Sequence, residues 1–340
     1  MPDDTPSSRS LGKTSPAGKS PGASPSEISS GSLAESAADD SMDAFLEEAA
    51  AVSDPAPSAA LAVFPMAVGE IVGNRFRIEG LAGSGGMGAV YRAADLTTGA
   101  RAAVKVIGRQ SASIRARFSR EGRVLAELSH PAIVRYLAHG VTGHGHPFLA
   151  MDWLEGMDLA HRLARAPIDV DDSFVLLRRA CEGLAVAHAH GIVHRDIKPS
   201  NLFLPGGDPA RGKVIDFGVA RFEEASAPLT RRGSALGTAG YMAPEQALEA
   251  ADVDARADVY ALGCVLFECL TGRPPFLGRH ASLLVKVIRE KPPRPSDLRP
   301  GLGVEVDALM GRLLAKDRTE RPGDAAEMLL AVDAVRAPPR

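Results

Sequence analysis

Cysteine is scarce in this sequence of 340 residues, which contains only Cys181, Cys264 and Cys269. An odd number without CxxC spacing argues against a disulfide framework and against a zinc ribbon. Free cysteine usually behaves as a small, buried hydrophobic side chain. We therefore expect reduced, buried thiols and a cytoplasmic protein.

Long hydrophobic runs are also missing. The most apolar stretch, 56–72, is interrupted by Pro57, Pro65 and Glu70. It therefore falls short of the ~20 apolar residues that cross a bilayer. The first residues, MPDDTPSS, are acidic and polar, unlike a secretory signal. The sequence predicts no association with a membrane.

The chain lacks the excess positive charge of nucleic-acid-binding proteins, because its formal net charge is -3. We expect no nucleic-acid partner. The first 70 residues hold 11 acidic and 3 basic residues, a net charge of -8, so the remainder carries +5 of the total of -3. An acidic segment thus precedes a mildly basic one.

Residues 1–70 are rich in Ser, Pro, Ala, Gly and Asp. Such a stretch buries too little apolar surface to offset its ordering entropy, so we predict a disordered tail. Within it, SMDAFLEEAAAV (41–52) is typical of a short helix capped by Ser41. Two interpretations stay open: a transient helix without a role, or a docking segment for a partner or for the domain itself.

From Arg75 onward the pattern is that of a folded α+β chain. Hydrophobic periodicity predicts a strand-rich lobe over about 75–151 and a larger helical lobe over about 155–335. The expected strands are 75–83, 89–96, 101–108, 133–141 and 147–154, and the expected helices are 113–128, 173–190, 258–271 and 281–290.

The glycine-rich run GSGGMGAV begins at Gly83, and Gly83, Gly85 and Gly88 fit the pattern GxGxxG. Glycine lets backbone amides approach phosphate oxygens without a Cβ in the way. The same pattern occurs between a strand and a helix in dinucleotide-binding folds. Here the next residues, AVYRAAD, favour a strand, which indicates a hairpin over phosphates.

Lys105 in AAVK lies among apolar neighbours. A buried lysine needs a partner. The expected helix that follows offers Glu121. A Lys105–Glu121 pair would direct the lysine towards the α- and β-phosphates of a nucleotide.

The segments HRDIKPSN (194–201) and VIDFG (214–218) combine two carboxylates and an amide at fixed separation. Mg²⁺ prefers oxygen ligands and accompanies phosphates, which suits Asn201 and Asp216. Asp196 remains as the group that accepts a hydroxyl proton. Lys198 is suited to neutralising a moving phosphoryl group.

Five motifs stand in one order: GSGGMGAV, AAVK, HRDIKPSN, DFG and GTAGYMAPE. Over roughly 75–335 the chain resembles a eukaryotic-type protein kinase catalytic domain, in particular the bacterial Ser/Thr protein kinases. The resemblance implies a bilobal kinase fold and transfer of the ATP γ-phosphoryl group to Ser or Thr of protein substrates, with ATP and Mg²⁺ as cofactors.

The resemblance also implies roles for individual residues. Asp196 is the catalytic base, Asn201 and Asp216 hold Mg²⁺, and Lys105, fixed by Glu121, contacts the phosphates. His194 packs against Phe217 and Leu125 and is no metal ligand. The other expected nucleotide-binding residues are Ala82, Gly83, Gly85, Gly86, Gly88, Val90, Ala103, Met151, Asp152, Leu154, Asp158 and Phe203.

Regulation is expected in the activation loop, 219–237. Phosphorylation at Thr230 or Ser234 would place a charge that pairs with Arg195. Thr238 matches the Ser/Thr-specific kinases, in which it contacts the catalytic residues. Since the chain ends at Arg340, soon after the kinase-like region, we expect control by the tail, this loop or a partner. We also expect self-association for trans-autophosphorylation and an autophosphorylated tail.

Structural roles and departures follow from the same resemblance. Glu245 and Arg321 match a buried ion pair, and Asp258 matches an aspartate beneath the catalytic loop. Ala82 replaces the usual Leu or Ile, which thins the roof over the adenine. The turn 205–212, PGGDPARG, is longer than usual and is expected at the surface.

The alternative hypothesis is a pseudokinase scaffold that binds nucleotide or partners without transfer. A pseudokinase usually lacks one of the residues Lys105, Asp196, Asn201 and Asp216, and all are present here. A small-molecule kinase is a third interpretation, against which the APE segment and the long activation loop argue. The sequence does not specify the protein substrate.

Overall fold

The computed structural model describes residues 66–85, 88–108, 122, 124–217, 239–250, 252–278 and 280–336. Most of the predicted tail, including the segment 41–52, lies outside these residues. So does much of the expected helix 113–128, of which residues 122 and 124–127 are described as helical.

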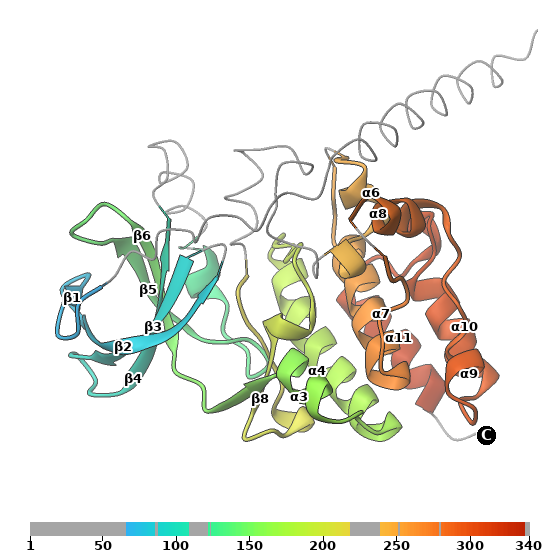
Figure 1. The fold of residues 1–340 in the computed structure, drawn as a ribbon, viewed down its shortest axis with the longest axis horizontal. Coiled ribbons are helices and arrows are strands. Elements are labelled where there is room, and N and C mark those ends of the chain that lie inside the picture. The colour runs from blue at the N-terminus through green and yellow to red at the C-terminus, as the bar shows by residue number, and fades with distance from the viewer. Residues whose placement is uncertain are drawn as a thin grey trace, which may run out of the picture. The chain divides into compact units, whose positions relative to one another are not determined.

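The first lobe is one antiparallel sheet (Figure 1). Its strands lie in the order β1-β2-β3-β4-β6-β5, so β6 pairs with β4 before β5 joins at the edge. Of the six strands, β1 was not predicted from the sequence. The strands are β1 (Ile71–Val72), β2 (Phe76–Gly85), β3 (Gly88–Asp95), β4 (Arg101–Ile107), β5 (Tyr136–Val141) and β6 (Pro147–Asp152).

Alternating burial along β3 explains why this segment is a strand. Tyr91 and Ala93 are buried on one face, where Phe76, Val104 and Phe148 complete a core of their own. β4 is buried from Ala102 to Ile107, as expected for a strand near the centre of a sheet. This burial places the Lys105 side chain in a low-dielectric environment.

A smaller sheet of β7 (Gly156–Asp158), β8 (Leu202–Pro205) and β9 (Lys213–Val214) belongs to the second lobe. β8 follows directly after the segment 194–201, so it fixes where that segment ends. The sequence analysis did not predict β7, which has only three residues.

The second lobe is mainly helical, and α7 lies at its centre with almost every residue buried. α4 packs against α7 and α11, and α10 contacts both α7 and α11 (Figure 1). The α-helices are α3 (Leu159–Arg165), α4 (Val170–Ala189), α6 (Pro244–Ala247), α7 (Arg256–Thr271), α8 (His280–Arg289), α9 (Pro295–Leu298), α10 (Val304–Leu313) and α11 (Ala325–Arg336). Short 3-10 turns are η1 (Pro199–Asn201), η2 (Pro209–Arg211), η4 (Ala239–Tyr241) and η5 (Arg318–Glu320).

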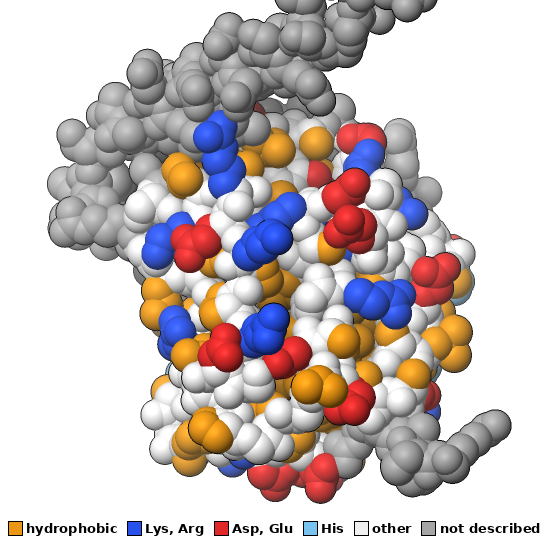
Figure 2. All heavy atoms as spheres, turned by 90° about the vertical axis from the view of Figure 1, so that its right-hand side faces the viewer, with side chains coloured by type: hydrophobic (Ala, Val, Ile, Leu, Met, Phe, Trp, Pro, Cys, Tyr) orange, Lys and Arg blue, Asp and Glu red, His pale blue; other side chains and the backbone are white. Residues whose placement is uncertain are grey.

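The predicted architecture, a strand-rich lobe before a larger helical one, is confirmed. The expected helices 173–190, 258–271 and 281–290 correspond to α4, α7 and α8. Among the described residues, no helix combines the length and apolar character needed to cross a membrane. The face of the helical lobe in Figure 2 carries acidic and basic side chains interspersed with hydrophobic ones.

The predicted ion pair between Glu245 and Arg321 is present and buried. Two parallel contacts join the groups: Nη1 to Oε1 at 2.8 Å and Nη2 to Oε2 at 3.0 Å. The guanidinium also lies over the ring of Tyr260, 4.9 Å from its centroid. The pair therefore ties α6 to the segment that precedes α11.

Glu245→Ala is expected to lower the free energy of unfolding by about 3–5 kcal/mol, because it leaves the Arg321 charge buried without its partner. Urea unfolding would measure the loss. Glu320→Ala, which removes an exposed carboxylate from η5, is the matched control and should change stability little. Equal stability of the two variants would contradict the structural role of the pair.

The three cysteines are free and buried, as the sequence predicts. Burial raises the pKa of the thiols of Cys181 and Cys264, and raises that of Cys269 to about 12. The thiols thus stay protonated in the fold under conditions in which unfolded thiols ionise.

Stability is expected to fall as the pH rises from 9 to 10. A thiol whose pKa is higher in the folded than in the unfolded protein makes its full contribution to stability below the unfolded pKa, about pH 9. Above about pH 9, the contribution of each thiol to the free energy of unfolding falls by about 1.4 kcal/mol per pH unit. Burial lowers the pKa of Lys316 to about 8 and also lowers that of Lys213, so these two lysines oppose the effect of the three thiols. Urea unfolding at both pH values tests this, and Cys181→Ala should reduce the decline. A stability that rises with pH would contradict it.

Candidate active site

Asp258, in the first turn of α7, anchors the segment 194–201. Its carboxylate accepts hydrogen bonds from the backbone amides of His194 and Arg195, each at 2.7 Å, and from His188 Nε2 at 2.9 Å. The aspartate is fully buried. Arg195 has a φ of 66°, a left-handed conformation that costs a non-glycine residue free energy. The carboxylate therefore holds a strained backbone in place. Asp258 lies beneath the loop 194–201, as the resemblance predicted.

His194 uses both ring nitrogens inside the protein. Its Nε2 donates to the carbonyl oxygen of Ile215 at 2.9 Å, and its Nδ1 accepts from the amide of Asp196 at 3.3 Å. Its ring lies 4.7 Å from that of Phe217, and Leu125 is buried in the same core. This geometry agrees with the predicted packing role and leaves neither nitrogen for a metal.

Asp196, Lys198 and Asn201 form one hydrogen-bonded cluster. Lys198 Nζ lies 2.9 Å from Asp196 Oδ2. Asn201 Nδ2 donates to the backbone oxygen of Asp196 at 2.7 Å and to its Oδ2 at 3.1 Å. The carboxylate of Asp196 is thus oriented by two groups, and the amide orientation makes Oδ1 of Asn201 the atom suited to a metal ion.

Lys105 and Asp216 meet across the two lobes. Lys105 Nζ lies 2.8 Å from Asp216 Oδ2, and the lysine is 6% exposed. Asp216 has a φ of 63°. Since Glu121 lies outside the described residues, the predicted Lys105–Glu121 pair stays a prediction. Among the described residues, Lys105 pairs with the predicted metal ligand.

Two backbone contacts position Asp216. The amide of Ile215 donates to the carbonyl oxygen of Asn201 at 3.0 Å, which sets the two predicted metal ligands side by side. The amide of Phe217 donates to the hydroxyl of Tyr136 at 3.0 Å. Burial, with a smaller contribution from the charge of Asp216, raises the pKa of Tyr136 and keeps its hydroxyl neutral.

The glycine-rich run joins β2 to β3 as an antiparallel hairpin, and Gly85 pairs with Gly88. A strand follows the glycines, so the dinucleotide-type arrangement of strand and helix is wrong for this chain. Gly88 has a φ of 138°, and a Cβ there would lie 2.0 Å from the carbonyl oxygen of Val106. This position therefore requires glycine for pairing with β4. Gly86 lies outside the described residues, Gly83 has open space around a hypothetical Cβ, and Ala82 is exposed.

The expected adenine-contacting residues lie on three neighbouring strands, β3, β4 and β6, and just after β6. Val90 pairs with Lys105, and Ala103 pairs with Met151 across β4 and β6. Asp152 ends β6, and Leu154 follows in the link to β7, packed against the main core. Met151, Asp152 and Leu154 thus lie where β6 leads into the second lobe.

Asp158 and Phe203, predicted for the ribose and the pocket floor, are partners in β7 and β8. The carboxylate of Asp158 also caps α3: its Oδ1 accepts from the amide of His161 at 2.8 Å. The structure thus gives Asp158 a helix-capping role that the sequence prediction did not include.

Gln246 in α6 is a contact that sequence reasoning missed. Its Nε2 donates to the carbonyl oxygen of Arg195 at 2.8 Å, and its Oε1 accepts from the amide of Ala243 at 3.2 Å. Gln246 directly follows Glu245 of the APE segment, and this position could have indicated a contact with the catalytic loop. The predicted regulatory residues Thr230, Ser234 and Thr238 lie outside the described residues.

Among the described residues, no group of three His, Cys, Asp or Glu side chains is arranged to hold a metal ion. The predicted ligands, one aspartate and one asparagine, do not form such a group. Mg²⁺ needs few protein ligands in phosphate-binding sites, because phosphates and water supply much of its coordination shell. The donor set of Asn201 and Asp216, beside Lys105, fits a magnesium-bound polyphosphate.

Known proteins resemble this chain in sequence. The family model for the protein kinase domain matches residues 76–333. The chain belongs to the protein kinase family. It is 38% identical over 265 residues to the Ser/Thr-protein kinase PknB of Mycobacterium leprae, covering 75% of this chain and 42% of the relative. It is 37% identical over 278 residues to the Ser/Thr-protein kinase pkn2 of Myxococcus xanthus, covering 78% and 33%.

A solved structure agrees with the fold. The crystal structure of the Mycobacterium tuberculosis PknI kinase domain superposes with a TM-score of 0.64 at 29% identity, covering 80% of this chain and 100% of that one. The predicted resemblance to bacterial Ser/Thr protein kinases is confirmed. The chain spans about two fifths or less of the length of these curated relatives.

Asp258→Asn is expected to lower the free energy of unfolding by about 1–3 kcal/mol, because an amide group cannot accept from three donors with one oxygen. Misplacement of the loop 194–201 should also reduce phosphoryl transfer by up to about a hundredfold. Urea unfolding and steady-state transfer measure the two effects. Asp254→Asn is the control, since Asp254 Oδ1 accepts one backbone amide, that of Arg256. Unchanged activity of Asp258→Asn would contradict the anchoring role.

Proposed function

We propose that the protein is a Ser/Thr protein kinase, which transfers the γ-phosphoryl group of ATP to Ser or Thr hydroxyls of protein substrates. The observation that carries the proposal is the pair of clusters Asp196–Lys198–Asn201 and Lys105–Asp216, joined by the hydrogen bond from the Ile215 amide to the Asn201 carbonyl. Together they supply a base, two cations and two oxygen ligands at one place.

Asp196 is the proposed base. Its carboxylate, oriented by Lys198 and Asn201, directs the acceptor hydroxyl and takes its proton late in the transfer. Lys198 then lies where it neutralises charge on the moving phosphoryl group. Little covalent chemistry is asked of the protein, so fixed position and compensated charge provide most of the rate enhancement.

Asn201 Oδ1 and the carboxylate of Asp216 are the proposed ligands of Mg²⁺. When bound, the ion neutralises charge on the β- and γ-phosphates. Lys105, buried and adjacent to Asp216, is the proposed contact of the α- and β-phosphates. The hairpin of β2 and β3 supplies backbone amides around the polyphosphate.

The catalytic domain is proposed to extend over about 75–335, which the family match to 76–333 supports. Phosphorylation of Thr230 or Ser234, by self-association and trans-autophosphorylation, is the proposed switch, with Arg195 as the partner of the phosphate. A cytoplasmic location, supported by the three buried free thiols, is also proposed.

Asp196→Asn is expected to reduce the rate of transfer from γ-labelled ATP by at least about a hundredfold while ATP binding is retained, because it removes the proton acceptor and leaves the phosphate contacts. Transfer to generic Ser/Thr acceptor proteins and ATP titration measure the two quantities. Asp171→Asn, which changes an exposed carboxylate in the first turn of α4, is the control. ATP binding without transfer in the wild type, with several acceptors, would favour the pseudokinase scaffold.

A further inference from the structure

The long turn 205–212, which the proposed chemistry does not use, lines a hollow of about 550 Å³. The other walls are the link between β6 and β7, at Trp153, and Arg179 of α4. Arg211 of η2 and Lys213 of β9 complete a group of three cations around it. Of the residues that line the hollow, only Leu154 is also an expected nucleotide-binding residue.

The positive charge of this hollow is only partly compensated. Lys213 Nζ donates to the carbonyl oxygens of Pro131 at 2.7 Å and Ile133 at 3.4 Å, which carry no formal charge. Arg211 forms no ion pair with any residue that the structure describes. The hollow therefore offers guanidinium and ammonium groups to an external anion.

Arg179 and Glu155, the remaining charged residues of the lining, each have a partner of opposite charge. Arg179 Nη1 bonds Glu182 at 3.1 Å, but its Nε is buried without a hydrogen-bond partner within the described part of the chain. Glu155, the acidic residue among the lining, already pairs with Arg101 at 3.0 Å. Within the residues that the structure describes, Arg211 and Lys213 thus lack a carboxylate partner.

The cations also act on one another. Burial lowers the pKa of Lys213, and the charges of Arg179 and Arg211 lower it further against an opposing effect of Asp152. Like charges held close together destabilise each other unless an anion lies between them. A bound carboxylate would relieve this repulsion.

The apolar part of the lining distinguishes the site from a simple anion site. Trp153 shares the hollow with Pro131, Leu154 and Pro205, and partly buried indole rings commonly anchor peptide ligands. A free phosphate would not use this surface. An acidic segment with one bulky apolar side chain would use both the ring and the cations.

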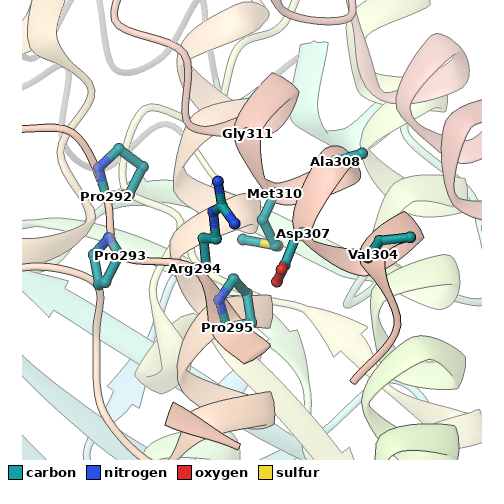
Figure 3. A pocket seen from close by; sticks show the side chains of 9 residues that line it. All are labelled: Pro292, Pro293, Arg294, Pro295, Val304, Asp307, Ala308, Met310 and Gly311. Carbon is teal, nitrogen blue, oxygen red and sulfur yellow. The ribbon is translucent and has the colours of Figure 1, made fainter. Parts of the chain in front are cut away.

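A second hollow differs from the first in the charge of its lining (Figure 3). It has about 370 Å³ and lies between the 292–295 segment and α10. It is lined by one cation, Arg294, and by Asp307, whose carboxylate accepts from Ser296. Its formal charges balance, so it lacks the attraction for an anion that the first hollow has.

We propose that the hollow around Trp153, Arg179, Arg211 and Lys213 is a docking site for an acidic segment of the kinase's protein substrates, separate from the segment that carries the acceptor hydroxyl. This inference rests on the proposed function for the identity of its ligand. Docking at a second point raises the effective concentration of the acceptor at the active site and lowers KM without altering the chemical step.

Trp153 provides a direct reporter, because it is the only tryptophan of the chain. The probe is a short Glu-rich peptide with two leucines, added to the nucleotide-free protein at physiological salt. We expect saturable change of tryptophan fluorescence. A peptide with Gln in place of Glu, and inorganic phosphate alone, should give none.

Arg211→Glu is the decisive variant, since Arg211 is exposed and makes no ion pair that its replacement would break within the described residues. It should weaken peptide binding by about tenfold or more. Arg77→Glu, an equal charge change on the exposed side of β2, is the matched control and should bind like the wild type. No fluorescence response, the same response to phosphate, or equal binding by Arg211→Glu would each overturn the proposal.

Kinetics separate this inference from the proposed function. An acceptor peptide joined to the acidic segment should show a lower KM than the acceptor alone, and Arg211→Glu should abolish that advantage with kcat unchanged. Binding without transfer to any acceptor would reject the proposed function and leave the site. Transfer with equal KM for both peptides would reject substrate docking and leave the kinase.

Discussion

The buried carboxylate of Asp258 is the interaction on which the rest of the site depends. It is one charged group that accepts from two successive backbone amides and from His188. His188 Nδ1 in turn accepts from the amide of Ala325 at 3.1 Å, which links α4, α7 and α11 through a single hydrogen-bonded chain. Bonds from ionised groups are stronger than neutral ones, so this aspartate can fix a loop that the local sequence would leave irregular.

Strain accompanies this fixation at two positions that matter for function. Arg195 and Asp216 both have left-handed backbone conformations, and each lies next to a residue of the His194–Phe217 packing. Such conformations persist where surrounding contacts over-determine them. Asp258 and Gln246 hold the first, and Tyr136 and Asn201 contact the residues beside the second. Lys105 of the first lobe contacts Asp216 of the second at this point.

Local patterns predicted the parts of this account that depend on neighbours in sequence. Alternation in AVYRAAD gave the hairpin, and the apolar setting of Lys105 indicated its burial. Asp216, which pairs with Lys105 in the described part of the chain, is 111 residues away from it, and the hydroxyl of Tyr136 contacts an amide 81 residues away. Such contacts depend on how distant segments pack, and no periodicity encodes them. The short strand β7 was missed because three residues carry too little pattern.

The phosphoamino-acid content of a generic acceptor protein, incubated with the chain, γ-labelled ATP and Mg²⁺, tests the central claim most directly. The account predicts label on phosphoserine and phosphothreonine, dependent on Mg²⁺. Label on phosphotyrosine, or an unlabelled acceptor although ATP is bound, would contradict it.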